Sequence, residues 1–191
     1  MKKNEILEIF KATDALLSGH FVLTSGRHSA SYFQCAKVLQ YPEYLSLFSR
    51  AIADHFGDDK INVVLSPAVG GIVLGTEVGR QLGVRTIFTE RKEEKMKLRR
   101  GFYVEKDEIV LVVEDVVTTG GSVKEAMQVA IDAGGRIAGA GILVDRSNGK
   151  AQIHSNQFAV TRLESLSFAP DEVPAELEAI PIQKPGSRHI A

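Results

Sequence analysis

The sequence is poor in the residues that build disulfide frameworks and metal clusters. Its 191 residues include one cysteine and no tryptophan. The single cysteine, Cys35, excludes an internal disulfide bond and a cysteine zinc cluster, and it fits a protein of the reducing cytoplasm. The five histidines lack H-x-x-x-H and H-E-x-x-H spacing, so a histidine metal site is not expected either.

Excess charge and long apolar runs are also missing. Lysine and arginine number 23 against 24 aspartate and glutamate residues, so the net charge is −1 and there is no basic field for nucleic acid. The longest uncharged stretch, residues 61–76, is interrupted by Pro67 and three glycines and is too short to span a membrane. Glu5 and Glu8 interrupt the apolar core that a signal peptide needs. We therefore expect a soluble cytoplasmic protein that binds neither nucleic acid nor membrane.

The sequence does contain an alternation of apolar strands and amphipathic helices. With 44% hydrophobic and 25% charged residues, the chain suits one α/β domain with a full core. The patterns predict helices at about 4–17, 42–56, 70–82 and 122–133, and strands at about 21–24, 32–36, 62–66, 85–90, 108–114, 136–144 and 158–163. This alternation predicts a mainly parallel sheet with helices on both sides, and no second domain.

Residues 109–123, IVLVVEDVVTTGGSV, carry the strongest functional pattern. The first five read as a buried central strand, and Glu114 and Asp115 follow at the edge where open α/β sheets bind ligands. Thr118 to Ser122 then supply a loop of small residues before a helix, which is a favourable anion site. The alternative is that the carboxylates merely begin a turn and the loop caps the helix. Neither G-x-x-x-x-G-K-[ST] nor G-x-G-x-x-G is present, so the Walker phosphate loop and the dinucleotide fingerprint are excluded.

Two further segments have features of anion binding. Residues 66–72, SPAVGGI, form a second strand-to-helix turn, whose paired glycines either present backbone N–H groups to an anion or merely allow close packing. Residues 90–101 hold three acids and six bases, namely Arg91, Lys92, Lys95, Lys97, Arg99 and Arg100. They belong to a charged stretch at about 91–107 without periodicity, and loops of this length are usually functional. The alternative is a solvated surface loop.

Aromatic and arginine side chains mark two more candidate positions. Residues 23–29, LTSGRHS, precede Tyr32 and Phe33, whose rings could stack on a heterocyclic base or simply pack in the core. Arg146 follows a predicted strand and could bind a carboxylate through two parallel hydrogen bonds. The alternative for Arg146 is a surface ion pair with Asp145 or another acid.

Together these motifs resemble the type I phosphoribosyltransferases over about residues 16–146. The acidic pair and the Thr-Thr-Gly-Gly-Ser loop match the family's phosphoribosyl pyrophosphate signature. The resemblance implies an α/β protein with the type I phosphoribosyltransferase fold, a central mainly parallel sheet flanked by helices with a small hood over the base site. It implies a single domain of residues 1–191, with hood elements at about 18–40 and 150–191 and a mobile catalytic loop at about 91–107.

The segments 23–29, L-x-S-G-R-x-S, and 91–95, R-K-x-x-K, are most similar to those of the orotate-specific members. The second segment implies that Lys95 is the catalytic lysine, which acts with Glu114 and Asp115. The same resemblance implies that phosphoribosyl pyrophosphate is bound by Ala68, Val69, Gly70, Arg91, Lys92, Lys95, Lys97, Glu114, Asp115, Val116, Val117, Thr118, Thr119, Gly120, Gly121 and Ser122. It implies that orotate is bound by Ser25, Tyr32, Phe33, Thr118 and Arg146.

Three positions depart from the orotate-specific pattern. Gly70 and Thr24 stand where many members have lysine, and Lys97 stands where a histidine is common. The missing lysine at position 70 removes a positive contact to diphosphate, so other bases must supply that charge. Many family members have a non-proline cis peptide in the turn that matches residues 66–69, and the resemblance extends this expectation to the present chain.

The implied reaction joins orotate and phosphoribosyl pyrophosphate to give orotidine monophosphate and diphosphate, as in the de novo synthesis of UMP. Mg²⁺ is the implied cofactor, and it is expected to be held mainly by substrate and water rather than by direct protein ligands. The resemblance also implies a homodimer. Two alternatives stay open: transfer to a purine or another base, and a non-catalytic regulator that senses phosphoribosyl pyrophosphate.

Overall fold

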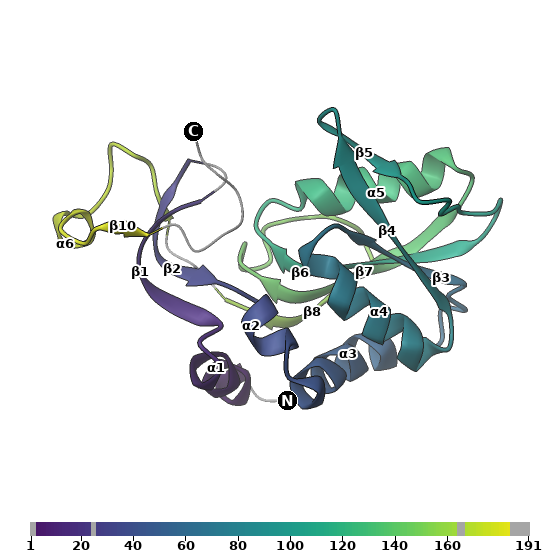
Figure 1. Ribbon diagram of the computed structural model, residues 1–191, viewed down its shortest axis with the longest axis horizontal. Coiled ribbons are helices and arrows are strands. Elements are labelled where there is room, and N and C mark those ends of the chain that lie inside the picture. The colour runs from purple at the N-terminus through teal and green to yellow at the C-terminus, as the bar shows by residue number, and fades with distance from the viewer. Residues whose placement is uncertain (1–2, 24–25, 164–166, 184–191) are drawn as a thin grey trace. The chain divides into compact units, whose positions relative to one another are not determined.

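A computed structural model describes residues 3–23, 26–163 and 167–183 (Figure 1). The chain forms two compact units. The larger unit comprises residues 41–163, and the smaller unit combines residues 1–40 with residues 164–191. No helix within the described ranges is long and apolar enough to cross a membrane.

The larger unit is built on a six-stranded sheet with the strand order β5-β4-β3-β6-β7-β8. Five strands are parallel, and β5 runs antiparallel to its neighbour β4. The bounds are β3 Val63–Pro67, β4 Arg85–Lys92, β5 Lys95–Leu98, β6 Ile109–Val117, β7 Arg136–Asp145 and β8 Gln157–Arg162. The arrangement confirms the predicted mainly parallel sheet and places β6 in its interior.

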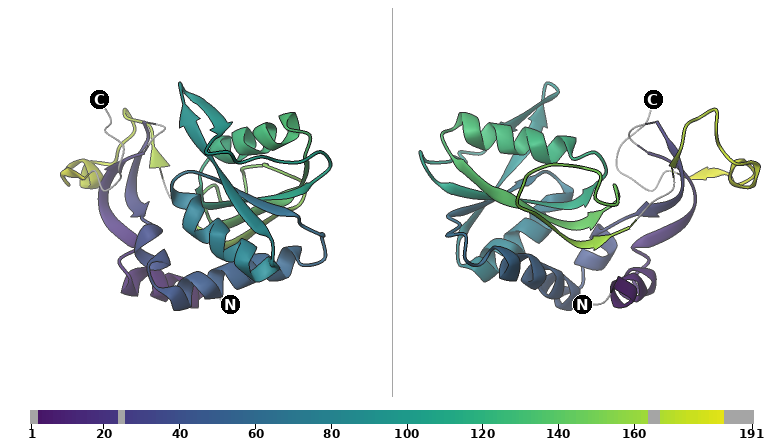
Figure 2. Two further views of the ribbon diagram at one scale, coloured as in Figure 1. Left: turned by 45° about the vertical axis from the view of Figure 1, so that its right-hand side comes forward. Right: turned by 180° about the vertical axis from the view of Figure 1, so that it is seen from behind.

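Helices cover both faces of this sheet (Figure 2). α3 (Pro42–Phe56) and α4 (Gly70–Leu82) pack on one face, and α5 (Gly121–Asp132) packs on the other. α3 and α4 begin and end where the sequence predicts them. Pro42 starts α3, where a missing N–H is tolerated, and Gly83 ends α4 with a left-handed φ of 71°.

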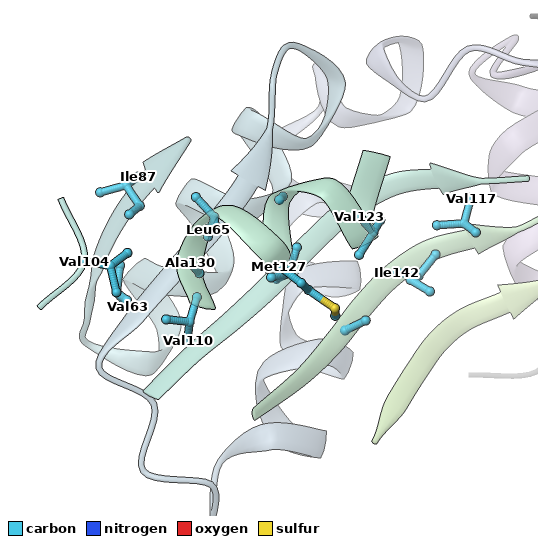
Figure 3. Close-up of a cluster of buried hydrophobic side chains, with 13 residues drawn as sticks. Val63, Leu65, Ile87, Val104, Val110, Val117, Val123, Met127, Ala130 and Ile142 are labelled. Carbon is cyan, nitrogen blue, oxygen red and sulfur yellow. The ribbon is translucent and has the colours of Figure 1, made fainter. Parts of the chain in front are cut away.

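Aliphatic side chains fill the space between the sheet and α5 (Figure 3). Val110 and Val112 of β6 are fully buried there and belong to the same cluster as Val123 and Met127 of α5. Full burial of one such side chain contributes about 1.5–3 kcal/mol. A shift of β6 by one residue would exchange its two faces and remove these valines from the cluster. The cluster therefore fixes the register of β6 and the positions of the residues at its carboxyl end.

The charged stretch predicted as a loop at about 91–107 contains a regular hairpin instead. β4 continues to Lys92, and β5 returns antiparallel to it after a two-residue turn. The turn residues Glu93 and Glu94 have positive φ angles of 53° and 62°, as two-residue hairpin turns require. Glutamate is not a usual turn residue, and charged side chains on both faces hide the strand period. For these reasons the sequence pattern did not reveal the hairpin.

The first helix of the smaller unit is shorter than predicted. α1 spans Lys3–Ala12 rather than 4–17. Asp14 has a left-handed φ of 51°, which takes the chain out of the helix. Leu16 and Leu17 instead begin the first strand. Two adjacent leucines fit a helix face and a buried strand equally well, so the apolar pattern alone extended the helix too far.

Segments from both ends of the chain form the four-stranded sheet of the smaller unit, in the order β10-β1-β2-β9. β1 (Leu16–Val22) and β2 (His28–Phe33) form the predicted hairpin, although each begins and ends before the predicted strand. β9 (Ser167–Phe168) pairs with β2, and β10 (Ile182–Gln183) runs parallel to β1. The short helices are α2 (Ala36–Leu39) and α6 (Ala175–Glu178). The proline-interrupted tail gave no sequence signal for β9, α6 or β10.

Candidate active site

Two adjacent carboxylates lie at the carboxyl end of β6, inside the strand rather than after it. β6 continues to Val117, and Glu114 pairs with Ile142 of β7. Glu114 is buried, and its Oε1 accepts the Asp115 N–H at 3.2 Å. Asp115 Oδ1 accepts the Val116 N–H at 2.9 Å. The backbone of the strand therefore holds both carboxylates in defined positions.

The surroundings of Asp115 disfavour its negative charge. Burial raises the pKa of the Asp115 carboxyl above its usual value, whereas hydrogen bonds with Glu114 and with backbone N–H groups act in the opposite direction. A carboxylate that has lost water gains strongly from a hydroxyl donor or from nearby positive charge. The pair therefore suits a polyhydroxy ligand on which positive charge can develop.

The loop after β6 leads into α5 without a side-chain cap. Gly120 is the N-cap residue, and its φ of 80° favours glycine. A larger residue would also clash, because its Cβ would lie 2.6 Å from the Ile153 side chain. Thr118 and Thr119 are exposed. The first-turn N–H groups of a helix lack partners within the helix, and the helix dipole adds positive potential at the same end. This loop can therefore receive an anion, as its sequence predicts.

The turn between β3 and α4 lies against the same carboxylates. Its Ala68–Val69 peptide bond is cis, as the resemblance implies for this segment. Gly70 and Gly71 open α4, and a Cβ on Gly70 would lie 2.6 Å from Oδ2 of Asp115. A Cβ on Gly71 would lie 3.0 Å from Oε1 of Glu114. The turn between β3 and α4 therefore lies against the acidic pair, and the other predicted anion-binding loop follows the same pair along the chain.

Acidic neighbours hold most of the basic side chains of the β4–β5 hairpin and the segment after it. The ion pairs are Arg91–Glu125, Lys97–Glu93, Arg99–Glu90 and Arg100–Glu90, with N···O distances of 2.8, 3.4, 3.8 and 2.9 Å. Glu125 belongs to α5, so the first pair ties the hairpin to the helix that follows the β6 loop. Sequence reasoning identified the bases but not these partners, because they come from other elements or from across the hairpin.

Lys92 and Lys95 differ from the other bases of this segment. They are directly opposite each other across the hairpin, and both are exposed. Within the part of the chain that the structure describes, neither has an ion-pair partner. Like charges that face each other across a sheet repel, and a bound anion would relieve this repulsion. Lys92 and Lys95 are therefore the hairpin cations most available to an anionic ligand.

Arg146 lies beside the β6 loop, at the end of the neighbouring strand. Val117 of β6 is the register partner of Asp145 in β7, and the Arg146 N–H donates to the Val117 carbonyl at 2.8 Å. Thr118, the first residue after β6, is therefore close to Arg146 along the same sheet edge. The structure thus brings together two of the residues predicted to bind orotate.

Asp145 fixes the turn that carries Arg146. Its carboxylate accepts the Ser147 N–H at 2.8 Å, the Ser147 hydroxyl at 2.6 Å and the Gly149 N–H at 2.9 Å. Its ion-pair partner in the structure is Arg162, at 3.9 Å. Sequence reasoning considered Asp145 only as a surface partner of Arg146. It missed this turn-forming role, for which the short D-R-S-N-G segment is the available signal.

The aromatic residues predicted to contact the base belong to the smaller unit. Phe33 is buried, and its ring meets that of Phe10 edge-on at a centroid distance of 6.0 Å. Tyr32 is half-buried, with its ring 5.6 Å from that of Phe21. Core packing therefore accounts for Phe33, whereas Tyr32 retains exposed surface. The predicted contact Ser25 lies outside the described residues.

Comparison with known proteins decides the family. The model of the phosphoribosyl transferase domain matches residues 35–176. The chain belongs to the phosphoribosyltransferase family. The matched region contains the turn between β3 and α4, the charged hairpin and the whole β6 loop.

Relatives of this phosphoribosyltransferase match it over its full length. The orotate phosphoribosyltransferase of Chlorobaculum parvum is 60% identical over 191 residues, which cover 100% of this chain and 99% of the relative. The orotate phosphoribosyltransferase of Pelotomaculum thermopropionicum is 54% identical over 190 residues, which cover 100% of both chains. The chain therefore groups with the orotate-named members of its family.

Solved structures show that the phosphoribosyltransferase fold serves different bases. The orotate phosphoribosyltransferase of Aeropyrum pernix has a TM-score of 0.72 at 24% identity, covering 83% of this chain and 94% of that one. An adenine phosphoribosyltransferase of Giardia lamblia, solved with 9-deazaadenine, has a TM-score of 0.59 at 19% identity, covering 70% and 87%. At these identities the likeness establishes the fold, so base choice must be argued from sequence identity and from individual residues.

Proposed function

We propose that this phosphoribosyltransferase transfers ribose 5-phosphate from phosphoribosyl pyrophosphate to orotate. The products are orotidine monophosphate and diphosphate, as in the synthesis of UMP. The observation that carries the proposal is that the glycine turn before α4 lies against the acidic pair of β6, which leads along the chain into the glycine loop before α5. Identity of 60% over the full length to a protein named orotate phosphoribosyltransferase favours orotate over other bases.

We assign the ribose 5-phosphate to the edge of the sheet at β6. The first-turn N–H groups of α5 and the hydroxyls of Thr118, Thr119 and Ser122 would hold the 5′-phosphate. The 2′ and 3′ hydroxyls would donate to the carboxylates of Glu114 and Asp115. As the bond to diphosphate breaks, positive charge develops on the ribose ring, and carboxylates already in position stabilise it without having to reorganise.

We assign the leaving diphosphate to the turn at residues 68–70 and to the hairpin. Position 70 offers no lysine, so Lys92 and Lys95 supply the charge. Lys95 would neutralise the oxygen that becomes negative as the bond breaks. Arg91 would also bind diphosphate once its ion pair with Glu125 is broken. Breaking this pair requires the hairpin to move away from α5. Closure of such a segment also excludes water from the reaction.

Mg²⁺ fits this site as an ion carried largely by the substrate. Glu114 and Asp115 offer the hard oxygen donors that it prefers. The described residues contain no cluster of three or more histidine, cysteine, aspartate or glutamate side chains suited to a metal ion. Ribose hydroxyls, diphosphate oxygens and water would therefore supply most of its ligands. When bound, the ion neutralises charge on the departing diphosphate.

We assign the carboxylate of orotate to Arg146. A guanidinium group can bind a carboxylate through two parallel hydrogen bonds, and this geometry is lost with lysine. The turn formed by Asp145 would hold Arg146 at the edge next to Thr118. Ser25 and Tyr32 remain base contacts proposed from the resemblance, whereas Phe33 packs against Phe10 in the smaller unit.

Arg146→Lys is expected to raise the KM for orotate about tenfold or more, which corresponds to the loss of one charge-assisted hydrogen bond. The KM for phosphoribosyl pyrophosphate should change little. Initial rates with each substrate varied in turn measure both constants. Arg136→Lys, at the opposite end of β7, is the matched control and should behave as wild type. An equal rise in both KM values would contradict the assignment of Arg146 to orotate.

The function is tested by mixing the protein with Mg²⁺, phosphoribosyl pyrophosphate and orotate and following the loss of orotate absorbance. We expect loss only when all components are present. Turnover with adenine or hypoxanthine, and none with orotate, would contradict the assignment of orotate as the substrate. It would show that the protein is a purine phosphoribosyltransferase instead. Binding of duplex DNA without any turnover would instead support the regulator.

We further propose a cytoplasmic homodimer, as the family resemblance implies. The single buried cysteine, Cys35, suits a reducing compartment. Light scattering is expected to give twice the chain mass of 20.8 kDa. A mass of one chain at micromolar concentration would contradict the dimer.

A further inference from the structure

Gly70 and Asp115 lie close together although Gly70 belongs to α4 and Asp115 to β6. The three atoms nearest to a Cβ on Gly70 would be Oδ2, Cγ and Oδ1 of Asp115, at 2.6, 2.8 and 2.8 Å. Real Cβ atoms do not approach other atoms so closely. Gly70 is not among the residues with positive φ. A side chain at position 70 would therefore require the Asp115 carboxylate to move, so in this chain the small size of glycine matters here rather than its conformational freedom.

We propose that Gly70 is a positioning residue for the Asp115 carboxylate. The inference rests on the proposed function, in which Asp115 accepts a ribose hydroxyl. Gly70 is the first residue of α4, a helix of 13 residues. The positive end of its dipole stabilises a neighbouring anion, and does so more strongly when the pair is partly buried. The bare backbone of Gly70 lets the Asp115 carboxylate lie against this helix end.

The neighbouring glycine has a different environment. A Cβ on Gly71 would meet the backbone carbonyl of Val113 at 3.0 Å and Cβ of Ser66 at 3.3 Å, in addition to Glu114. A side chain at position 71 would therefore disturb the strand as well as a carboxylate. At position 70, by contrast, all three nearest atoms belong to one carboxyl group. A methyl group there can be accommodated if the Asp115 side chain alone rotates.

Rotation of Asp115 would separate the acceptor from the ribose hydroxyl while leaving the fold intact. Displacement of a catalytic group by about 1 Å can reduce the rate about 10²-fold. The helix dipole would also act less on the displaced carboxylate, because its effect is confined to the first turn. We therefore expect Gly70→Ala to reduce kcat/KM about 10²-fold, with little change in the unfolding temperature.

A double-mutant cycle tests this inference. Wild type, Gly70→Ala, Asp115→Ala and the double variant are compared by kcat/KM with orotate, by calorimetric affinity for phosphoribosyl pyrophosphate with Mg²⁺, and by thermal unfolding. If Gly70 acts through Asp115, Gly70→Ala weakens activity and affinity in the wild-type background. It should have no further effect in the Asp115→Ala background, where the carboxylate is gone.

The control is Gly57→Ala, at the end of α3. A Cβ on Gly57 would lie at an ordinary distance of 3.4 Å from the Ala53 carbonyl, and its φ is −58°. We expect this variant to retain wild-type activity and affinity. The comparison separates the loss of a glycine in general from the displacement of Asp115.

Two results would overturn the inference. One is an equal effect of Gly70→Ala in both backgrounds, which would mean that Gly70 acts on the turn and not on Asp115. The other is wild-type activity and affinity in Gly70→Ala. If Gly70→Ala lowers the unfolding temperature, the double variant decides the cause. Recovery of the unfolding temperature in the double variant would support the contact between position 70 and Asp115, and an equally low unfolding temperature would refute it. Turnover of orotate by the wild type is measured separately, and its absence would contradict the proposed function. The double-mutant cycle can still be evaluated from the affinities for phosphoribosyl pyrophosphate, so the inference about Gly70 is tested independently.

Discussion

Lys95→Ala is expected to lower kcat about 10²- to 10³-fold, the usual effect of removing one group that stabilises transition-state charge. Lys95 is exposed at the hairpin and faces Lys92, and neither is held by an acid within the described residues. Its charge becomes most valuable as diphosphate departs, so the affinity for phosphoribosyl pyrophosphate should fall much less than kcat. Steady-state rates and calorimetry with Mg²⁺ present measure the two effects.

Two companion variants sharpen the test of Lys95. Lys106→Ala removes an exposed lysine that precedes the opposite end of β6, and it should keep wild-type activity. Lys92→Ala should weaken the affinity for phosphoribosyl pyrophosphate and lower kcat less than Lys95→Ala does. Equal losses of kcat and affinity in Lys95→Ala would contradict a role confined to the transition state.

Asp115→Asn is expected to lower kcat/KM about 10²-fold or more, because the variant loses a negative charge beside the developing cation. The pH profile should change as well. Burial raises the pKa of Asp115, so the acid limb of the wild-type kcat/KM profile should lie above the usual aspartate range. Wild-type activity should increase as pH rises through this pKa, and the limb should be absent or displaced in Asp115→Asn. An unchanged limb would show that another group controls it.

The same variant should be more stable than wild type at neutral pH. A raised pKa means that folding favours the protonated form of Asp115 over the ionised form. The stability contributed by the protonated carboxyl is therefore fully present below the pKa of the unfolded chain, and it is lost as pH rises through the pKa of the folded protein. The difference in unfolding temperature between Asp115→Asn and wild type should therefore be small at acid pH and grow as pH rises. Thermal unfolding across this range measures it. Such a gain in stability with a loss of activity is common at functional sites.

Periodic segments with clear ends could be predicted from the sequence. α3 and α4 have an apolar stripe, a starting proline or glycine pair and a terminating glycine, and their bounds match the prediction. The apolar run of β6 identified a central strand and the place of the carboxylates. Elements stabilised mainly by partners distant in the sequence were missed. β9 and β10 are two residues each, and only pairing with β2 and β1 makes them strands.

In the candidate site, too, features that are contiguous in the chain could be predicted, and contacts between distant segments could not. Glu114, Asp115 and the loop at 118–122 were identified because their chemistry is contiguous in the chain. The contact between Gly70 and Asp115 and the pairing of Arg91 with Glu125 arise from the packing of separate elements. Single-sequence patterns carry no direct information about such contacts. The resemblance to the family supplied residue roles, and the structure supplied the neighbours that set their charge and position.

The sheet of the smaller unit has a consequence for how the chain is made. β1 emerges early in synthesis, yet one of its edges is paired by Ile182 and Gln183 near the end of the chain. The His20 ring is also 3.0 Å from the Ile180 carbonyl. Contacts between such distant segments form slowly, because a long loop must close first. The larger unit contains its own core and is made before β10, so it can fold first, whereas the smaller sheet can be completed only after residues 182 and 183 have been made.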